Sequence, residues 1–404
     1  MSCNGPGMLF ISPLLAMPQQ HGGCVYPDAV LRAMHAAGMA IDYVWLAWPL
    51  RSRRVIMRDP LRAPFVRSGF VPGTYLFGNL RVREPRDWWR RAPCLSGSAI
   101  SVESLPGPNE QSFLRRLLRR VDARAILVDF ATTLPVLDGL SVSERSRLRV
   151  AVLTHNLIYR RTELYRERGL PLDFRGLTRE EEAALLRRAD VIVAIQEREA
   201  AEFRKLVPDR KVVVVPMPVN SLQSRAEKDT GKRCLFIGGH SGHNLDGLNW
   251  FLREVWPVVL ARNPDADFDV VGTVGNAVPA DAPKVHVYGQ QDDLSTIYNQ
   301  ATVCIVPLRF GTGLKIKLVE AMVHGRVVVT TSAGAEGYSE LEAGIVVTVA
   351  DTSTAMAEAI THLLCDGAAR KAQIARQDAW VKDHLAGFRA VAPLLAFLGE
   401  DPLT

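Results

Sequence analysis

One segment of the chain combines glycines and charged residues at spacings that suit a phosphorylated ligand. A strand-like run at residues 302–307 leads into a turn with Gly311 and Gly313, a helix-like stretch and a second apolar run at 327–329. The two glycines allow a sharp turn and a close approach of the backbone to a ligand. The amides that begin the helix carry partial positive charge, so an anion is the expected ligand.

Three charged side chains of this stretch could contact the anion and a sugar attached to it. Lys315 and Lys317 would place positive charge beside a phosphate, and Glu320, one turn further on, could accept hydrogen bonds from a diol such as a ribose. The same residues also fit an ordinary strand-turn-helix whose charged side chains face solvent. The segment alone does not decide between these interpretations.

The elements that must position this segment alternate between strands and helices, which is typical of parallel sheets. In the first half, strands are expected at 8–15, 41–47, 125–129, 149–154, 191–195 and 212–215, and helices at 25–37 and 178–188. In the second half, strands are expected at 233–237, 268–271, 285–288, 302–307 and 345–349, and helices at 245–261, 294–301, 354–365 and 369–398. The predicted fold class is α/β, with two Rossmann-like parallel-sheet domains.

A polar stretch without periodicity, residues 218–231, reads as a linker between the two halves. We expect an amino-terminal domain at 1–217, a carboxyl-terminal domain at 232–378, and a final helix at 379–404 that packs back on the first domain. Within the first domain the alternation breaks down at residues 51–113, which are rich in Pro, Arg and Trp. This segment reads as an irregular insertion.

The composition is that of an ordinary globular protein. The chain has 404 residues, of which 48% are hydrophobic and 23% are charged, enough for two or three domains with large cores. Its six cysteines show neither close pairing nor metal-ligand spacing, so we expect reduced thiols in a cytoplasmic protein. No stretch reaches the roughly 18 apolar residues that a membrane-spanning helix requires.

The positive charge is concentrated in the amino-terminal half. The first 211 residues hold 33 Lys and Arg against 22 Asp and Glu, whereas the remainder holds 16 against 21. Most of the basic residues are arginines, in clusters such as Arg115, Arg116, Arg119 and Arg120. Such faces suit phosphate groups, anionic lipid surfaces or nucleic acid. A compositional bias toward arginine explains the same excess without a partner.

Motifs over most of the chain occur together in the order of a known family. The carboxyl half holds Leu235-Phe-Ile-Gly-Gly, the stretch 244–257, Val287-Tyr-Gly, the segment 311–325 and Thr330-Thr-Ser-Ala-Gly-Ala-Glu-Gly; the amino half holds Gln20-His-Gly-Gly-Cys-Val and Val152-Leu-Thr-His-Asn. The set resembles the retaining glycosyltransferases of the two-domain GT-B fold that are grouped as glycosyltransferase family 4. The resemblance implies an enzyme that moves a sugar from a nucleotide-sugar donor to a hydroxyl group.

The resemblance also implies roles for single residues. His155 would lie at the reaction centre, although a buried core histidine at a strand end would look the same in sequence. Arg160 and Arg161 could contact an acceptor phosphate or form a solvated helix face. The expected donor-binding residues are Gly22, Gly23, Gly238, Gly239, Asn244, Gly311, Thr312, Gly313, Lys315, Lys317 and Glu320.

Two positions depart from the pattern of the family. Many relatives carry a second glutamate eight positions before the one at Glu320, where it reaches the donor hexose, and this chain has Thr312 there. Gly239 and Asn244 stand where many relatives have an arginine and a lysine. Lys315 and Lys317 are the expected replacements for that lost charge.

The resemblance further implies the reaction and the partners. We expect retention of the anomeric configuration, no metal and no cofactor, since no cluster of metal-ligating residues is evident. In this fold the amino domain usually holds the acceptor, here a lipid-linked saccharide of bacterial surface polysaccharide, with residues 51–113 beside it. The basic half then predicts a peripheral position at an anionic membrane, and no nucleic acid is expected.

Two other functions share these motifs. A sugar-nucleotide 2-epimerase has the same fold, but it would need acid and base carboxylates in the cleft that the sequence does not place. A non-catalytic nucleotide-sugar-binding partner would keep the carboxyl-half motifs and lose the histidine, whereas His155 is present.

Overall fold

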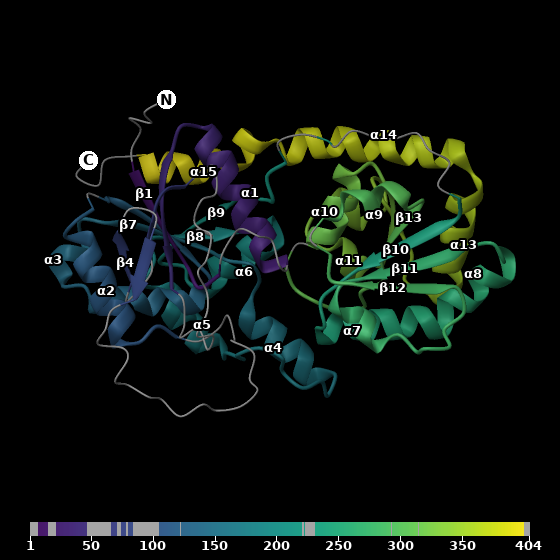
Figure 1. Cartoon of the computed structure of the whole chain (residues 1–404), viewed down its shortest axis with the longest axis horizontal. Coiled ribbons are helices and arrows are strands. Elements are labelled where there is room, and N and C mark those ends of the chain that lie inside the picture. The colour runs from purple at the N-terminus through teal and green to yellow at the C-terminus, as the bar shows by residue number, and fades with distance from the viewer. Residues whose placement is uncertain are drawn as a thin grey trace.

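The chain folds into two α/β domains that lie side by side along the long axis of the molecule (Figure 1). The computed structural model describes residues 7–14, 22–46, 66–70, 74–77, 80–83, 105–121, 123–219, 222, 231–291, 293–313 and 315–399. Each domain is built on one parallel sheet, of seven strands in the first domain and six in the second. The predicted fold class is confirmed.

The sheet of the amino domain has the order β3-β2-β1-β6-β7-β8-β9. Its strands are β1 (Gly7–Ser12), β2 (Ala40–Trp45), β3 (Val66–Phe70), β6 (Ala125–Asp129), β7 (Arg149–Leu153), β8 (Val191–Ala194) and β9 (Lys211–Val214). Alternate residues face opposite layers: Met8 and Phe10 belong to one hydrophobic cluster, and Leu9 and Ile11 to another. Strands buried on both faces explain the continuous apolar runs in the sequence.

Helices cover both faces of this sheet. They are α1 (Gly22–Ala36), α2 (Pro108–Leu118), the 3₁₀ segment η2 (Ala131–Gly139), α3 (Val142–Arg145), α4 (Ile158–Glu167), α5 (Arg179–Leu186) and α6 (Glu197–Leu206). Side chains of α1 pack in the same layer as Phe10, while those of α2, α5 and α6 pack in the layer of Leu9. Thr178 starts α5 through a reciprocal capping box with Glu181.

The carboxyl domain repeats the arrangement with the order β12-β11-β10-β13-β14-β15. Its strands are β10 (Arg233–Ile237), β11 (Asp267–Val271), β12 (Val285–Gly289), β13 (Val303–Val306), β14 (Val327–Thr330) and β15 (Thr348–Val349). The surrounding elements are α7 (Gly242–Trp250), the π turn η3 (Phe251–Val255), α8 (Trp256–Arg262), the 3₁₀ turn η4 (Thr273–Ala277), α9 (Ser295–Gln300), α10 (Ile316–Val323), α11 (Ser332–Ala335), α12 (Ser339–Glu342) and α13 (Ser353–Cys365).

Two final helices join the domains. Helix α14 (Gly367–His384) runs from the carboxyl domain toward the amino domain, and α15 (Gly387–Gly399) lies on the first sheet (Figure 1). A guanidinium nitrogen of Arg149 donates a hydrogen bond of 2.6 Å to the carbonyl of Phe397. Where the chain first leaves the amino domain, Val219 pairs with Ala386, so both crossings between the domains lie side by side.

Three expectations of the sequence were wrong in detail. The segment 51–113 is not wholly irregular: its described residues add β3 to the edge of the sheet, the hairpin β4 (Thr74–Phe77) and β5 (Leu80–Arg83), and the start of α2. The helix expected at 369–398 is two helices, and the strand expected at 345–349 is reduced to two residues. The rest of 51–104 lies outside the described residues.

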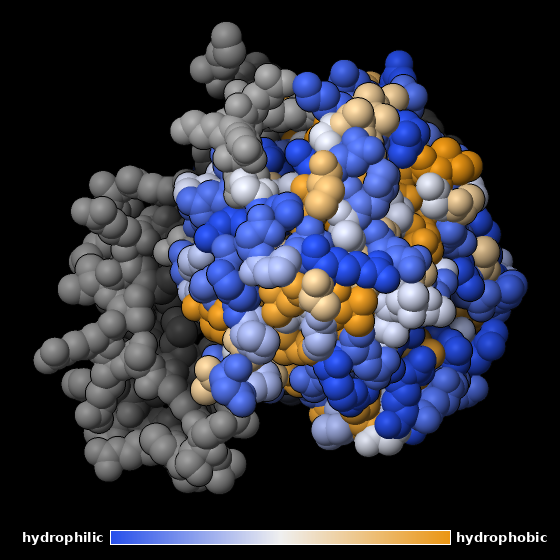
Figure 2. Space-filling view, turned by 90° about the vertical axis from the view of Figure 1, so that its right-hand side faces the viewer, coloured by the Kyte–Doolittle hydropathy of each residue, from blue (hydrophilic) through white to orange (hydrophobic). Residues whose placement is uncertain are grey.

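None of the helices in the described part of the chain has the length and apolarity needed to span a bilayer. Figure 2 shows the outer end of the carboxyl domain, where hydrophobic areas are separated by hydrophilic ones over most of the described surface.

Candidate active site

The strand order of each sheet defines a crevice at the carboxyl ends of its central strands. In the first sheet, β1 lies between β2, the next strand along the chain, and β6; in the second, β10 lies between β11 and β13 in the same way. Ligands of open parallel sheets bind at such reversal points. The two crevices face each other, because Gly313 of the carboxyl domain contacts His155 and Glu199 of the amino domain.

A hydrogen-bonded chain of three side chains occupies the crevice of the amino domain. His155 follows β7, Asp129 ends β6 and Ser12 ends β1. The Nε2 atom of His155 lies 2.7 Å from Oδ1 of Asp129, and Ser12 Oγ donates to Oδ2 of Asp129 at 2.7 Å. Because Asp129 is fully buried, this carboxylate holds the imidazole in one orientation.

Aromatic rings also hold His155 in place. Its ring stacks on Phe130 with a centroid distance of 3.9 Å and an interplanar angle of 4°, and the edge of Tyr26 from α1 lies at 5.6 Å. Phe130 has a φ of 65°, which a non-glycine residue adopts only at a cost. In this backbone conformation the Phe130 ring stacks on His155.

The glycine turn of the carboxyl domain touches the His155 segment directly. Gly313 has a φ of +77°, and a Cβ atom there would lie 2.5 Å from the carbonyl oxygen of His155. Glycine is therefore required at this position for both its backbone conformation and its lack of a side chain. The Gly313 amide donates 2.8 Å to Oε1 of Glu199, a residue of α6 in the other domain.

Lys315 supports this turn instead of projecting from it. Its side chain is only 6% exposed, and its Nζ donates 2.7 Å to the carbonyl of Gly313 and 3.4 Å to that of Thr312. The carboxylate of Glu336 lies 3.9 Å away. This differs from the expectation that Lys315 places its charge beside a phosphate, because its donors are directed at its own loop.

Lys317 lies beside Gly239 and Asn244, the two positions where the family pattern has an arginine and a lysine. Its Nζ donates 2.6 Å to Oδ1 of Asn244 and lies 4.6 Å from the ring centre of Phe236. Asn244 in turn donates to the carbonyl of Gly239 and packs against Gly238. Burial lowers the pKa of Lys317 to about 7, with Lys315 adding to the shift and Glu320 opposing it.

Glu320 lies one turn further along α10, beside Lys317. Its Oε2 accepts a hydrogen bond of 3.3 Å from the hydroxyl of Tyr298, whose ring stacks on His324. Burial raises the pKa of Glu320 to about 7, while the Tyr298 hydrogen bond and Lys317 oppose the shift. A lysine and a glutamate whose charged forms are both disfavoured lie together at the carboxyl end of the central strands.

The remaining residues predicted from sequence fall into two groups. Gly22 and Gly23 do not form a loop but begin α1, whose Tyr26 reaches His155. Arg160 and Arg161 are engaged by carboxylates of their own domain: Arg160 lies 2.9 Å from Glu163, and Arg161 lies 3.3 Å from Asp173 and over the Phe174 ring. Arg160 is therefore held on the surface of its own helix, whereas Arg161 lies next to Asp173, a residue that lines the recess between the domains.

Two buried glutamates escaped the sequence analysis. Glu199 accepts the amides of Leu157 and Gly313 on one oxygen, and Glu182 accepts the amides of Ile158 and Tyr159 at the start of α4. Burial raises the pKa of Glu199 to about 8 and that of Glu182 to about 7. Both occupy positions on the apolar stripe of their helix, and a charged residue in such a stripe is the signal that could have revealed them.

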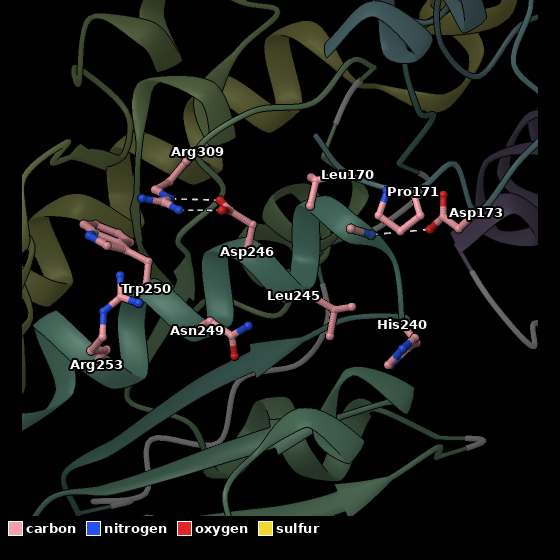
Figure 3. A pocket seen from close by; sticks show the side chains of 11 residues that line it. Leu170, Pro171, Asp173, His240, Leu245, Asp246, Asn249, Trp250, Arg253 and Arg309 are labelled. Carbon is pink, nitrogen blue, oxygen red and sulfur yellow. Dashed lines mark hydrogen bonds and ion pairs between the residues drawn. The ribbon is translucent and has the colours of Figure 1, made fainter. Parts of the chain in front are cut away.

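A cavity of about 500 Å³ lies beside this region, between the domains (Figure 3). The amino domain contributes Leu170, Pro171 and Asp173, and the carboxyl domain contributes His240 and Gly242, residues of α7, Arg253 and Arg309. Figure 3 shows Arg309 paired with Asp246 on one wall. The cavity does not include the glycine turn or His155, so it is a second recess next to the crevice.

Within the described residues, no group of three or more His, Cys, Asp or Glu side chains is arranged to hold a metal ion. His240, before α7, is exposed, whereas His243, in the first turn of α7, lies 3.2 Å from the hydroxyl of Tyr165.

Comparisons with known proteins agree with this arrangement. Residues 231–366 match a family model described as glycosyl transferases group 1. A Klebsiella pneumoniae protein described as an "Uncharacterized 44.6 kDa protein in cps region" is 32% identical over 115 residues, which are 26% of this chain and 30% of that relative. The match thus spans less than a third of the relative's length.

Solved structures share the fold over nearly the whole chain. Sucrose-phosphate synthase from Thermosynechococcus elongatus has a TM-score of 0.68 at 16% identity, covering 96% of this chain and 97% of that one. TarM has a TM-score of 0.73 at 8% identity, covering 99% and 100%. A variant of S. aureus TarM has been solved in complex with Fondaparinux, alpha-GlcNAc-glycerol and UDP.

The matched domain and the two-domain fold together define the class of this protein. The carboxyl domain carries the glycosyl transferases group 1 match, and the whole chain has the two-domain GT-B fold of the solved structures.

Proposed function

We propose that the protein transfers a sugar from a nucleotide-sugar donor, bound between the two domains, to a hydroxyl group of a glycan acceptor. The observation that carries the proposal is the contact between the two crevices: the glycine turn of the donor segment lies against His155 and Glu199 of the other domain. One ligand placed there would meet residues of both domains. The family match of residues 231–366 supports the same reaction.

The donor diphosphate lies at the carboxyl ends of β10 and β13 in this proposal. Lys317 supplies its charge, and the backbone of Gly238, Gly239, Gly311, Thr312 and Gly313 lines the same place, with Asn244 orienting the lysine. The helix start at Gly22 and Gly23 approaches from the amino domain. Lys315 acts by holding the turn, and Glu320 binds the ribose hydroxyls.

The chemistry fits a basic group that gains charge when the donor binds. Breaking the glycosidic bond of the donor produces an oxocarbenium-like sugar and a diphosphate leaving group, so positive charge near the diphosphate stabilises the transition state. His155, held by Asp129, contacts the sugar and places the acceptor hydroxyl. We infer retention of configuration from the resemblance to glycosyltransferase family 4, and metal independence from Lys317 acting as the counter-charge.

The acceptor reaches the crevice through the neighbouring cavity. That cavity is wide enough for a saccharide unit and lies between the domains, next to the loop of Leu170 and Asp173. Asn249 and Arg253 offer polar contacts on the α7 side (Figure 3). The relative in a cps region supports a place in polysaccharide synthesis, and a lipid-linked acceptor at an anionic membrane would suit the basic amino domain.

A panel of nucleotide sugars tests the function. Purified protein is incubated with each candidate, with and without a membrane extract, and release of nucleoside diphosphate is followed. Transfer predicts release with one donor that depends on the extract, and Asn249→Trp should raise the amount of extract needed at least about tenfold without changing the donor requirement. Conversion of a donor to its epimer without release would identify a 2-epimerase. Binding without any conversion would identify a non-catalytic partner.

A further inference from the structure

Three buried polar atoms at the contact between the domains lack a hydrogen-bond partner among the described residues. They are Oε2 of Glu199, Oγ1 of Thr312 and Oε1 of Gln196. Buried polar atoms are nearly always paired, so a group of unpaired ones calls for an explanation. Thr312 belongs to the glycine turn, and Gln196 and Glu199 lie at the start of α6, which bonds the turn through Glu199.

Glu199 connects the two domains through its other oxygen. Oε1 accepts the amide of Leu157, at the start of α4, at 3.2 Å and the amide of Gly313 at 2.8 Å. Both oxygens belong to a side chain that is almost fully buried. The carboxyl group therefore holds the glycine turn through Oε1, while Oε2 has no hydrogen-bond partner among the described residues.

The unpaired atoms lie next to the residues that the proposed function assigns to the donor. Thr312 directly precedes Gly313, whose Cα approaches the carbonyl of His155. Gln196 packs against Gly337, where an added Cβ would lie 1.5 Å from its Oε1. Glu336, the neighbour of Gly337, lies 3.9 Å from Lys315 of the same turn. The three atoms thus share one small region that both domains build.

A sugar is the ligand class that matches this set. Its neighbouring hydroxyl groups both donate and accept hydrogen bonds, and a carboxylate, a threonine hydroxyl and an amide carbonyl together can satisfy them. Burial raises the pKa of Glu199 to about 8, while Lys315 opposes the shift. Because this pKa lies near neutral pH, the carboxylate can accept a hydrogen bond from one hydroxyl or, when it is protonated, donate a hydrogen bond to another.

We propose that Glu199 binds a hydroxyl group of the donor sugar through Oε2 while its Oε1 holds the glycine turn, so that the amino domain contributes to donor recognition. The proposal rests on the proposed function, because it assumes a nucleotide sugar in the crevice. Glu199 then contacts the sugar and not the nucleotide.

The test compares two ligands that differ only in the sugar. Calorimetry measures the affinity of wild-type protein, Glu199→Gln and the control Glu202→Gln for the accepted nucleotide sugar and for its nucleoside diphosphate. Glu202 is a half-buried residue of the same helix that pairs with Lys205. We expect Glu199→Gln to lose at least about tenfold in affinity for the nucleotide sugar and less than about twofold for the diphosphate.

Donors lacking single hydroxyl groups locate the contact. Removing one particular hydroxyl should weaken binding to the wild type and have no effect on Glu199→Gln. Equal loss for both ligands would reduce Glu199 to a support of the turn, and no loss for either would remove it from the site; both results overturn the proposal.

Thr312→Val provides the test if Glu199→Gln does not fold. This change keeps the shape of the side chain and removes Oγ1, and it should weaken the nucleotide sugar selectively. An unchanged affinity for the sugar donor would overturn the placement of the sugar. A wild-type protein that binds no nucleotide sugar at all would instead contradict the proposed function itself.

Discussion

At the scale of single residues, the crevice contains two groups whose ionised forms are disfavoured by burial. Burial brings the pKa of Lys317 down to about 7 and raises that of Glu320 to the same range. A diphosphate beside Lys317 would restore its positive charge, so binding and protonation are linked. The part of the pH dependence of donor affinity that Lys317→Ala removes reports on this lysine.

We predict that donor affinity falls as pH rises above about 7. The protonated form of Lys317 binds the diphosphate, and above its pKa the fraction of that form in the free protein drops about tenfold per pH unit. The diphosphate of a nucleotide sugar keeps its charge over this range, whereas Glu320 titrates within it, so calorimetry from pH 6 to 9 compares the wild type with a variant that lacks the lysine.

Lys317→Ala should bind at least about tenfold more weakly at pH 6.5 and lose most of the pH dependence. Lys371→Ala, a change at an exposed lysine of α14, serves as the control. A wild-type profile that is flat between pH 6 and 9 would place Lys317 outside the donor site.

His155 offers a second prediction at this scale. Its Nε2 bonds Asp129, which is buried, so replacement by alanine would leave that carboxylate with Ser12 alone. His155→Asn retains a polar side chain toward Asp129 and removes the imidazole. We expect turnover to fall at least about a hundredfold while donor affinity changes much less, as for a group that positions reacting atoms.

Steady-state kinetics and the melting temperature of His155→Asn check this expectation together. Normal turnover in a folded variant would return His155 to the role of a core histidine stacked on Phe130.

At the scale of elements, helix α4 depends on a carboxylate from its neighbour. Glu182 of α5 accepts the amides of Ile158 and Tyr159, which replaces the capping side chain that Leu157 cannot supply. Burial raises the pKa of Glu182 to about 7. The same helix carries Tyr165 and Arg161 to the domain contact, so its stability matters for the crevice.

The free energy of unfolding should therefore carry a contribution from Glu182 that depends on pH. Its folded pKa lies above its unfolded value, so this contribution is fully present below about pH 4.5 and is lost as pH rises through about 7. The full change is on the order of 3 kcal/mol.

Denaturant unfolding of wild type and Glu182→Gln measures this contribution. The variant loses one accepting oxygen but cannot ionise, so its stability relative to wild type should improve from pH 5 to pH 8. A difference in unfolding free energy that stays constant from pH 5 to pH 8 would contradict the raised pKa of the buried Glu182 carboxyl group.

Periodicity predicted most strands to within one or two residues, because strands buried on both faces leave continuous apolar runs. It missed β3, which lies at the sheet edge in a segment with little apolar character, and it joined helices that the fold separates. Pro257 lies inside the expected helix 245–261, and the chain forms the π turn η3 just before it since proline provides no amide hydrogen. The break after His384 arises where Gly387 bonds Val219 of the linker.

The candidate site was predicted only in part for a similar reason. Gly313, Lys317 and Glu320 belong to one local segment, and local spacing is visible in a sequence. Glu199 reaches Gly313 across 114 positions, so its partner depends on how the two domains meet. Lys315 has the same local pattern as Lys317, and only the closed turn shows that its amine points inward.

At the scale of the whole molecule, charge separates the two domains. The basic excess of the first 211 residues includes the arginines of α2 and its end, of which Arg115 and Arg119 pair with Glu144 while Arg116 and Arg120 are exposed. Exposed ion pairs contribute little and leave the surrounding potential positive. This face is the proposed contact with an anionic membrane.

Changing Arg115, Arg116, Arg119 and Arg120 together to Gln should weaken binding to vesicles that contain anionic lipid. Each well-placed arginine contributes roughly 1 kcal/mol near such a surface, and the attraction is screened within about 10 Å at 0.1 M salt. Vesicle sedimentation at two salt concentrations measures the effect, with Arg262→Gln of the carboxyl domain as control. Wild-type protein that ignores anionic vesicles at low salt would leave the arginines as compositional bias.

The central claim is that the donor lies between the domains and is held by both. Hydrogen–deuterium exchange with and without the nucleotide sugar that supports transfer tests it most directly, because amide protection can be read separately in each domain. We predict added protection in peptides covering 22–26 and 155–159 of the amino domain and 238–244 and 311–320 of the carboxyl domain, with α13 unchanged. If transfer proceeds while protection is confined to one domain, or to the residues that line the cavity beside α7, the donor is not held by both domains and the account is contradicted.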